Sequence, residues 1–143
     1  MNKDFFISIT NHIKQTVPEI CWVDADENQL NTSSRPPLGW PACLVDISYT
    51  NCETHVGGKQ KIKARVELRV AFYLQGQTNA DAPTEVRERA LKRFDVLENL
   101  HRSLQWWNGE GLFNPLRRIS SMPEKRADGL KVYKVIYETE FFD

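Results

Sequence analysis

Cysteine and histidine are the first residue types in this chain that could do chemistry. Cys52 and His55 have the C-x2-H spacing of half a zinc site, and Cys43, His12 or His101 could supply further ligands. A structural zinc site needs a second pair with similar spacing, and the sequence offers none nearby. The same residue types could form a nucleophilic Cys–His pair, but no local context orients a thiol toward an imidazole. We therefore predict no metal, no cofactor and no catalytic residue.

Two segments match parts of known binding motifs, one of a calcium loop and one of a phosphate loop, and neither motif is complete. Asp24, Asp26 and Asn28 occupy the first three ligand positions of a calcium loop, but Gln29 stands where glycine is needed and Arg35 where glutamate is needed. The run 57–59, Gly-Gly-Lys, lacks both the preceding glycine and the following Ser or Thr of a phosphate loop. These glycines are better explained as turn residues.

A basic stripe is the remaining candidate for ligand recognition. It lies on the outward face of one predicted strand and consists of Lys61, Lys63, Arg65 and Arg69, interrupted by Glu67 and followed by Tyr73. A basic sheet face with interleaved aromatic rings is used to bind single-stranded RNA. Only one aromatic residue is interleaved here, and nineteen basic residues are balanced by nineteen acidic ones. We therefore expect the stripe to face solvent or a neighbouring subunit. A small nucleic-acid-binding module and an uncharacterised ligand-binding domain are the alternative functions, and we rank both lower.

The strand that carries this stripe is the clearest element of the chain. From Lys61 to Leu74 apolar and mostly charged residues alternate almost without error, which is typical of a half-buried β-strand. At roughly 3.3 Å per residue it would reach about 46 Å. A compact chain of this length has a diameter of only about 37 Å. We therefore expect the strand to overhang its own domain with a long exposed edge, which must curl, be covered or pair with another subunit.

Apolar spacing, prolines and glycines predict the other elements. In chain order they are a helix over 4–17, a short strand over 20–23, a long polar loop or arm over 24–39, a strand over 42–49, a turn at 57–58, a helix over 84–104, a short strand within 113–121 and a final, central strand over 131–142. The predicted inward faces of the two helices are Phe6, Ile9, Ile13 and Val17, then Val86, Ala90, Phe94, Leu97, Leu100 and Leu104. Trp106 and Trp107 follow the second helix, and we expect them to anchor a neighbouring subunit.

Together these elements predict one α+β domain over residues 1–143. We expect a mixed or mainly antiparallel sheet with a long β-hairpin and two helices packed on one face. The three cysteines, Cys21, Cys43 and Cys52, are an odd number without a C-x-x-C pair, which favours a reducing compartment and leaves their role open. The N-terminal apolar run is too short and too polar for a signal peptide or a membrane span. We therefore predict a cytoplasmic protein.

The order of the predicted elements resembles that of the tail terminator, or tail-completion, proteins of long-tailed phages and related prophages. The resembling parts are the helix 6–17, the segments 21–23 and 41–46, the strand 66–70, the helix 87–104 and the closing strand 132–138. They cover nearly the whole chain. The resemblance is one of architecture, without a diagnostic residue, and it does not separate a terminator from a neck adaptor or a minor tail protein.

The resemblance implies a structural protein rather than an enzyme. Members of that family form homo-oligomeric rings, commonly hexamers, which cap the tail tube and join it to head-connector proteins. It implies that this protein assembles in the cytoplasm and ends in the virion tail. The predicted long strand suits such a role, because strands that overhang one subunit can continue a sheet into the next. The polar arm over 24–39 could clasp a neighbour.

Overall fold

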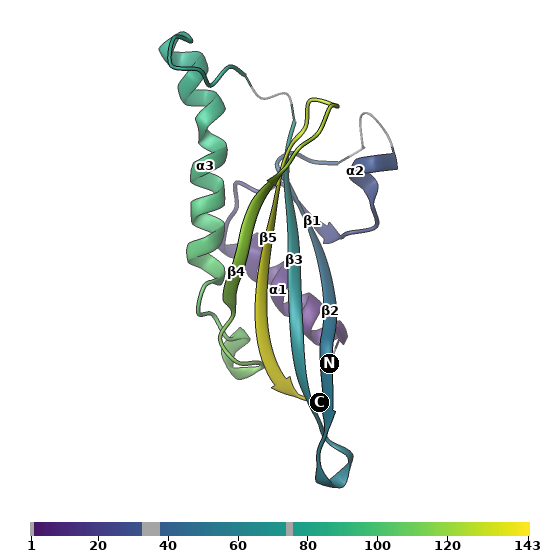
Figure 1. Cartoon of the computed structure of the whole chain (residues 1–143). Helices are drawn as coiled ribbons and strands as arrows, with labels where there is room; N and C mark the ends of the chain where they lie inside the picture. The colour runs from purple at the N-terminus through teal and green to yellow at the C-terminus, as the bar shows by residue number, and fades with distance from the viewer. Residues whose placement is uncertain (1, 33–37, 74–75) are drawn as a thin grey trace.

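The computed structural model describes residues 2–32, 38–73 and 76–143. Its elements are α1 (Asn2–Thr16), β1 (Trp22–Ala25), α2 (Gln29–Thr32), β2 (Ala42–Thr54), η1 (Val56–Gly58), β3 (Gln60–Phe72), α3 (Thr84–Leu104), η2 (Gly109–Gly111), β4 (Arg117–Glu124) and β5 (Lys131–Phe142). Figure 1 shows a single sheet with α1 behind it and the long α3 toward the β4 side.

The sheet has five strands in the order β1-β2-β3-β5-β4. β1 pairs with β2 in parallel, and the other three pairs are antiparallel. The predicted α+β fold with a mixed sheet and a long hairpin is therefore confirmed. The hairpin joins β2 to β3 through Gly57 and Gly58, whose φ values of 83° and 82° lie in the left-handed region that glycine adopts without strain.

The predicted long strand exists as β3, but the expectation that it overhangs with an exposed edge is wrong. β3 is a central strand, paired with β2 on one side and with β5 on the other from Lys61 to Ala71. Its two neighbours are almost as long as it is, so they satisfy the backbone on both flanks. Leu74, its predicted last residue, lies outside the described residues. The uncovered backbone belongs to β2, because β1 ends opposite Val45.

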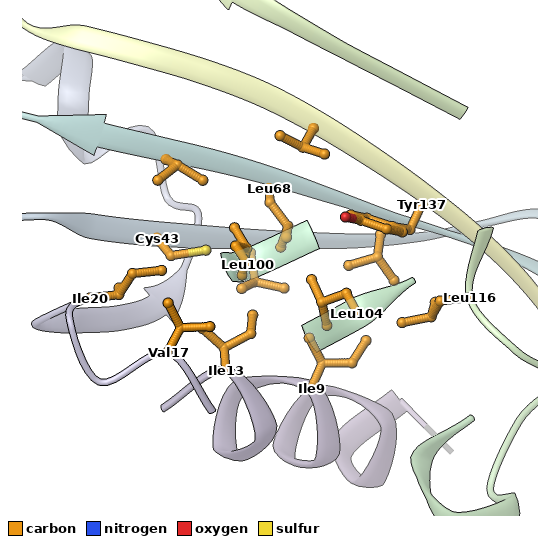
Figure 2. Close-up of a cluster of buried hydrophobic side chains, with 14 of the residues drawn as sticks. Ile9, Ile13, Val17, Ile20, Cys43, Leu68, Leu100, Leu104, Leu116 and Tyr137 are labelled. Atoms are coloured by element: carbon orange, nitrogen blue, oxygen red, sulfur yellow. The ribbon is translucent and has the colours of Figure 1, made fainter. Parts of the chain in front are cut away.

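Both long helices pack on one face of the sheet, as predicted, and they enclose the main core. Figure 2 shows this cluster, to which the helices contribute Ile9, Ile13, Leu100 and Leu104 and the sheet contributes Cys43, Leu68 and Tyr137. α1 ends at Thr16, just before Pro18, as expected from the missing N–H and the clash of the proline ring.

The predicted faces of the helices are each shifted at one point. In α1 the fully buried aromatic residue is Phe5, whereas Phe6 is only half-buried. In α3 the residues that face the sheet include Arg93 and Val96, whereas Phe94 is 46% exposed. The helices exist where the periodicity predicted them, and the other predicted inward residues are buried or half-buried.

A smaller apolar cluster covers the upper half of the opposite, outer face of the sheet. It is made of Leu30, Leu44, Ala71, Leu130 and Val132. Leu30 comes from α2, so the predicted loop over 24–39 is wrong in part: its first residues finish β1 and four more form a short helix that packs on the sheet. Residues 33–37 of the predicted arm lie outside the described residues.

Candidate functional site: a charged sheet face and two strand edges

The predicted basic stripe lies on the outer face of the sheet, and glutamates from β5 face it across the strand pair. Lys61 Nζ lies 3.4 Å from Glu140 Oε2. Lys63 Nζ and Arg65 Nη2 lie 3.6 Å and 3.5 Å from the two carboxylate oxygens of Glu138. Opposite charges at facing positions of antiparallel strands stabilise the pair modestly. The stripe is therefore one half of a mixed charged ladder, which gives little support to nucleic-acid binding.

Arg69, the fourth basic residue of the stripe, belongs to a buried ionic cluster. It is 8% exposed, and its Nη2 donates to Glu124 Oε2 at 2.8 Å while its Nη1 lies 3.5 Å from Asp26 Oδ2. Arg126 donates to the same Glu124 oxygen at 2.6 Å and to Asp128 Oδ2 at 2.5 Å. Burial alone would raise the pKa of the Glu124 carboxyl, but the hydrogen bonds from the two guanidinium groups hold it below its usual range.

This cluster ties three parts of the chain to the outer face. Besides its acidic partners, Arg126 Nη2 donates to the Leu30 carbonyl at 2.7 Å, and its Nη1 donates to Asn31 Oδ1 at 2.8 Å. The loop between β4 and β5 therefore folds over the sheet toward α2. Because both guanidinium groups are satisfied by these contacts, the cluster has a structural explanation and needs no ligand.

The aromatic residues predicted as interface anchors do not join the basic stripe. Tyr73 stacks on Trp40 with ring centroids 5.4 Å apart beside the small outer cluster. Trp107 is half-buried and stacks on His12, with centroids 3.7 Å apart and planes at 6°, while His12 Nε2 lies 2.8 Å from the Ser103 carbonyl. Trp106 is 67% exposed. Of the predicted residues, Trp106 alone presents a large open apolar surface.

One edge of the sheet is open along β2. Hydrogen bonds alternate in an antiparallel ladder, so every second residue directs its N–H and C=O away from a given neighbour. The reciprocal pair of Gln60 with Asp143 and the bond from the Asp26 N–H to the Val45 carbonyl fix this phase. Beyond Val45 the backbone groups of Ile47, Tyr49 and Cys52 then point outward. β3 pairs with this part of β2, Asp46–Thr54, on one flank, and no strand of the described residues pairs with it on the other flank.

A groove of about 470 Å³ accompanies this open edge. α1 forms one wall through Asn2 and Phe6, and Ile47 and Tyr49 from the inner face of β2 line it as well. The Tyr49 hydroxyl is buried and has no hydrogen-bond partner among the described residues. Its pKa is raised, first by burial and then by the charge of Asp143. A strand added to β2 would therefore meet an apolar inner side and a polar outer side.

The other edge of the sheet, β4, is partly closed by the chain itself. The Trp106 N–H donates to the Leu116 carbonyl at 2.8 Å, just before the strand begins. The outward N–H of Arg118 donates to Gln105 Oε1 at 2.9 Å. Pro123, near the end of the strand, has no N–H to offer. The outward backbone groups of Ser121 remain, together with the carbonyl groups of Arg118 and Pro123.

The cysteines and histidines do not assemble into a reactive site. Burial raises the pKa of the Cys43 thiol to about 12, whereas Cys21 and Cys52 are exposed, and all three are free thiols. His101 Nδ1 lies 2.9 Å from the hydroxyl of the buried Tyr137. Burial, and secondarily the nearby Arg118 charge, lowers the pKa of that imidazole. Across residues 2–32, 38–73 and 76–143, no group of three or more His, Cys, Asp or Glu is placed to hold a metal ion.

Sequence reasoning missed the two features that now stand out, the open β2 edge and the ionic cluster around Arg69. One signal for the charged ladder was present, because Lys134, Glu138 and Glu140 alternate in the last strand as the bases do in β3. No sequence pattern indicated which strand would lack a neighbour on one side. In the part of the chain that is described, no helix has the length and apolar character needed to cross a membrane.

Comparison with known proteins adds no relative. No protein-family model matches the sequence. A search of curated proteins finds no significant match either.

Proposed function

We propose that this protein is a non-enzymatic structural component of a phage or prophage tail. It forms a homo-oligomeric ring that terminates or completes the tail tube and joins it to the head. The proposal rests on the order of elements along the chain, which resembles tail terminator proteins, and on one structural observation. That observation is the uncovered half of β2, a strand edge of nine residues, Asp46–Thr54, that carries neither proline nor lysine.

Exposed strand edges of this kind are hazards for a monomer. Proteins that remain monomeric usually blunt them with charged residues, prolines, bulges or a covering element. β4 carries such protection at both ends. The uncovered part of β2 has one bulge, between Tyr49 and Asn51, and two charged residues, Asp46 and Glu53, but no proline, no lysine and no covering strand among the described residues. This contrast supports a protein whose second edge is covered in an assembly.

The distribution of exposed apolar residues agrees with an assembling protein. Nine large apolar side chains of the described residues are more than a third exposed; Val56, Trp106, Leu112 and Phe142 lie in turns or at a strand end, and five lie on elements near the two edges of the sheet: Ile7, Trp22, Phe94, Ile119 and Met122. Ile7 and Trp22 belong to α1 and β1, near the β2 edge. The others belong to α3 and β4. Two such surfaces on opposite sides of one subunit suit head-to-tail contacts, which form a ring when the rotation between neighbouring copies closes.

The test is the mass of the protein in solution. We expect light scattering combined with gel filtration to give a multiple of the 16.6 kDa chain, increasing with concentration to one closed species. Negative-stain electron microscopy of that species should show rings, alone or on the ends of tail tubes assembled from the tube protein of the same phage. A strict monomer at all concentrations, without rings on tube ends, would contradict the proposal.

A further inference from the structure

We propose that the edge strand β4 of one copy pairs antiparallel with the uncovered part of β2, Asp46–Thr54, in the next copy, so that the sheet runs on from subunit to subunit. This inference rests on the proposed ring and names the surfaces that would form it. The two segments match in length, since β4 has 8 residues. They also match in charge: the β2 segment carries Asp46 and Glu53 and no basic residue, whereas β4 begins with Arg117 and Arg118.

The register follows from keeping the inner and outer faces of the two sheets continuous. Arg117 lies on the outer face, opposite Glu138, and Glu53 lies on the outer face, opposite Lys61. Placing Arg117 opposite Glu53 of the next copy brings opposite charges together. Both strands carry a bulge, between Arg118 and Ser120 in β4 and between Tyr49 and Asn51 in β2. The two bulges offset each other, so the faces remain matched along the whole pair.

The free backbone groups agree with the same register. In β4 the residues that direct their backbone outward are Arg118, Ser121 and Pro123, and in β2 they are Cys52, Tyr49 and Ile47. This register places them opposite one another in that order, as an antiparallel ladder requires. Pro123 removes one donor, and the Arg118 N–H must leave Gln105 Oε1, to which it donates at 2.9 Å. Pairing therefore forms new backbone hydrogen bonds between the two copies at all three positions. The Pro123 position forms one bond fewer than the other two, because proline has no N–H.

Pairing between two identical β2 edges is disfavoured. An antiparallel pair in which the two segments overlap over their full length with matched faces sets Asp46 opposite Glu53 of the other copy, and the two-fold symmetry repeats that clash. Like charges at facing positions destabilise a strand pair. The contact is therefore heterologous, and a heterologous contact leads to a ring or a helical array rather than to a closed dimer.

The geometry of the pairing agrees with closure. Arg117 is level with Arg65 in the sheet, and Glu53 is level with Lys61, so each copy shifts along the strands by about four residues, roughly 13 Å. One copy adds four strands, which span roughly 19 Å across the sheet. The resulting tilt of the strands is about 35°, at the lower end of the ~35–45° of closed barrels. The loop after Glu124 turns over the outer face toward Leu30, away from this edge.

Disulfide trapping tests the register. Cys52 is native and exposed, and residues that share a pair of hydrogen bonds have Cα atoms about 5.5 Å apart, within the range that a disulfide spans. In a Cys21→Ser background we introduce Arg118→Cys and oxidise mildly. Cys43 is buried and does not compete. Non-reducing gels should show a ladder from dimers to a covalent ring, in most of the protein.

Matched controls separate this result from random collisions. Met122→Cys places a thiol at another exposed position of the same strand but on the opposite face, and it should not be trapped with Cys52. Cys52→Pro removes an N–H that points outward and spares the β2–β3 ladder, so it should lower the assembled fraction at least tenfold. Cys52→Ser should assemble normally. Circular dichroism and thermal unfolding should show that each variant keeps the fold.

The outcomes are distinct. A ladder with Arg118→Cys but not with Met122→Cys supports the proposed contact. Rings without that cross-link overturn the contact and leave the tail function standing. A covalent dimer formed through Cys52 alone, in the Cys21→Ser background, means that two β2 edges pair, and overturns it as well. A monomer at all concentrations and on tube ends overturns both proposals.

Discussion

Replacing Arg69 with methionine should destabilise the fold far more than removing any other base of the stripe. Methionine keeps much of the side-chain volume but removes a guanidinium that is 8% exposed. Glu124 then loses its bonds of 2.8 and 3.1 Å to Arg69, and Asp26 loses the guanidinium that lies 3.5 Å from its carboxylate. Two largely buried carboxylates thereby lose positive charge that offset the cost of their desolvation.

The expected magnitude follows from these contacts. Removing one partner of a buried ion pair costs about 3–5 kcal/mol. Glu124 keeps Arg126 at 2.6 Å, and the side chains of Asp26 and Glu124 are 13% and 27% exposed, so water screens part of the loss. We expect a loss of about 2–3 kcal/mol in the free energy of unfolding. Lys63→Met is the matched control: its side chain is 44% exposed, so its loss should be under about 1 kcal/mol.

Urea unfolding followed by circular dichroism at pH 7 and pH 3 measures both effects. The folded pKa of Glu124 is depressed, so its stabilisation is present above the unfolded value of about 4.3 and is lost as the pH falls through the folded value. The difference between wild type and Arg69→Met should therefore shrink at pH 3. Equal losses for Arg69→Met and Lys63→Met at pH 7, or an undiminished difference at pH 3, would refute the assignment of a buried ionic cluster.

Three further predictions concern the core, a histidine and the thiols. Leu104→Ala opens a cavity in a fully buried site and should cost about 3–4 kcal/mol in urea unfolding; a loss under 1 kcal/mol would contradict the packing in Figure 2. The depressed pKa of His101 means that the unfolded chain protonates first, so stability should fall as the pH drops below about 6.5, and His101→Gln should weaken that dependence. A thiol reagent should modify Cys21 and Cys52 in the native protein, and Cys43 only after unfolding; rapid native labelling of all three would contradict its burial.

The sequence predicted the buried faces and the lengths of the strands better than it predicted which strands lie side by side. Strict alternation located β3, because a strand with one buried side has a period of two. Alternation does not state which strand lies alongside, and that is why β3 was expected at an edge when it is central. The open edge arises because β1 ends after only 4 residues. The residues of β2 and β3 contain no sign of where β1 ends.

The helical faces show a second limit. Arg93 is buried because its guanidinium donates to the Tyr133 hydroxyl at 3.0 Å and to the Ala90 carbonyl at 3.1 Å. A search for apolar residues at helical spacing overlooks such a side chain and selects the neighbouring Phe94. Of the predicted site residues, the bases of β3 were placed correctly on one outward face, but their acidic partners come from a strand some seventy positions away, which spacing within one segment does not reveal.

The pairing of β3 with β5 has a consequence for synthesis on the ribosome. Arg65 and Glu138, which face each other across that pair, are separated by 73 positions. The β2–β3 hairpin can close within roughly 1–10 μs of emerging, but translation at about 5–20 residues per second delivers β5 on the order of ten seconds later. Until then the flank of β3 that will pair with β5 stays without a partner, and when the hairpin forms, only α1, β1 and α2 of the elements that cover it in the folded protein have been synthesised. A nascent chain with such an unpaired strand edge and incompletely covered apolar face is prone to aggregate, and we expect chaperones to act in this interval.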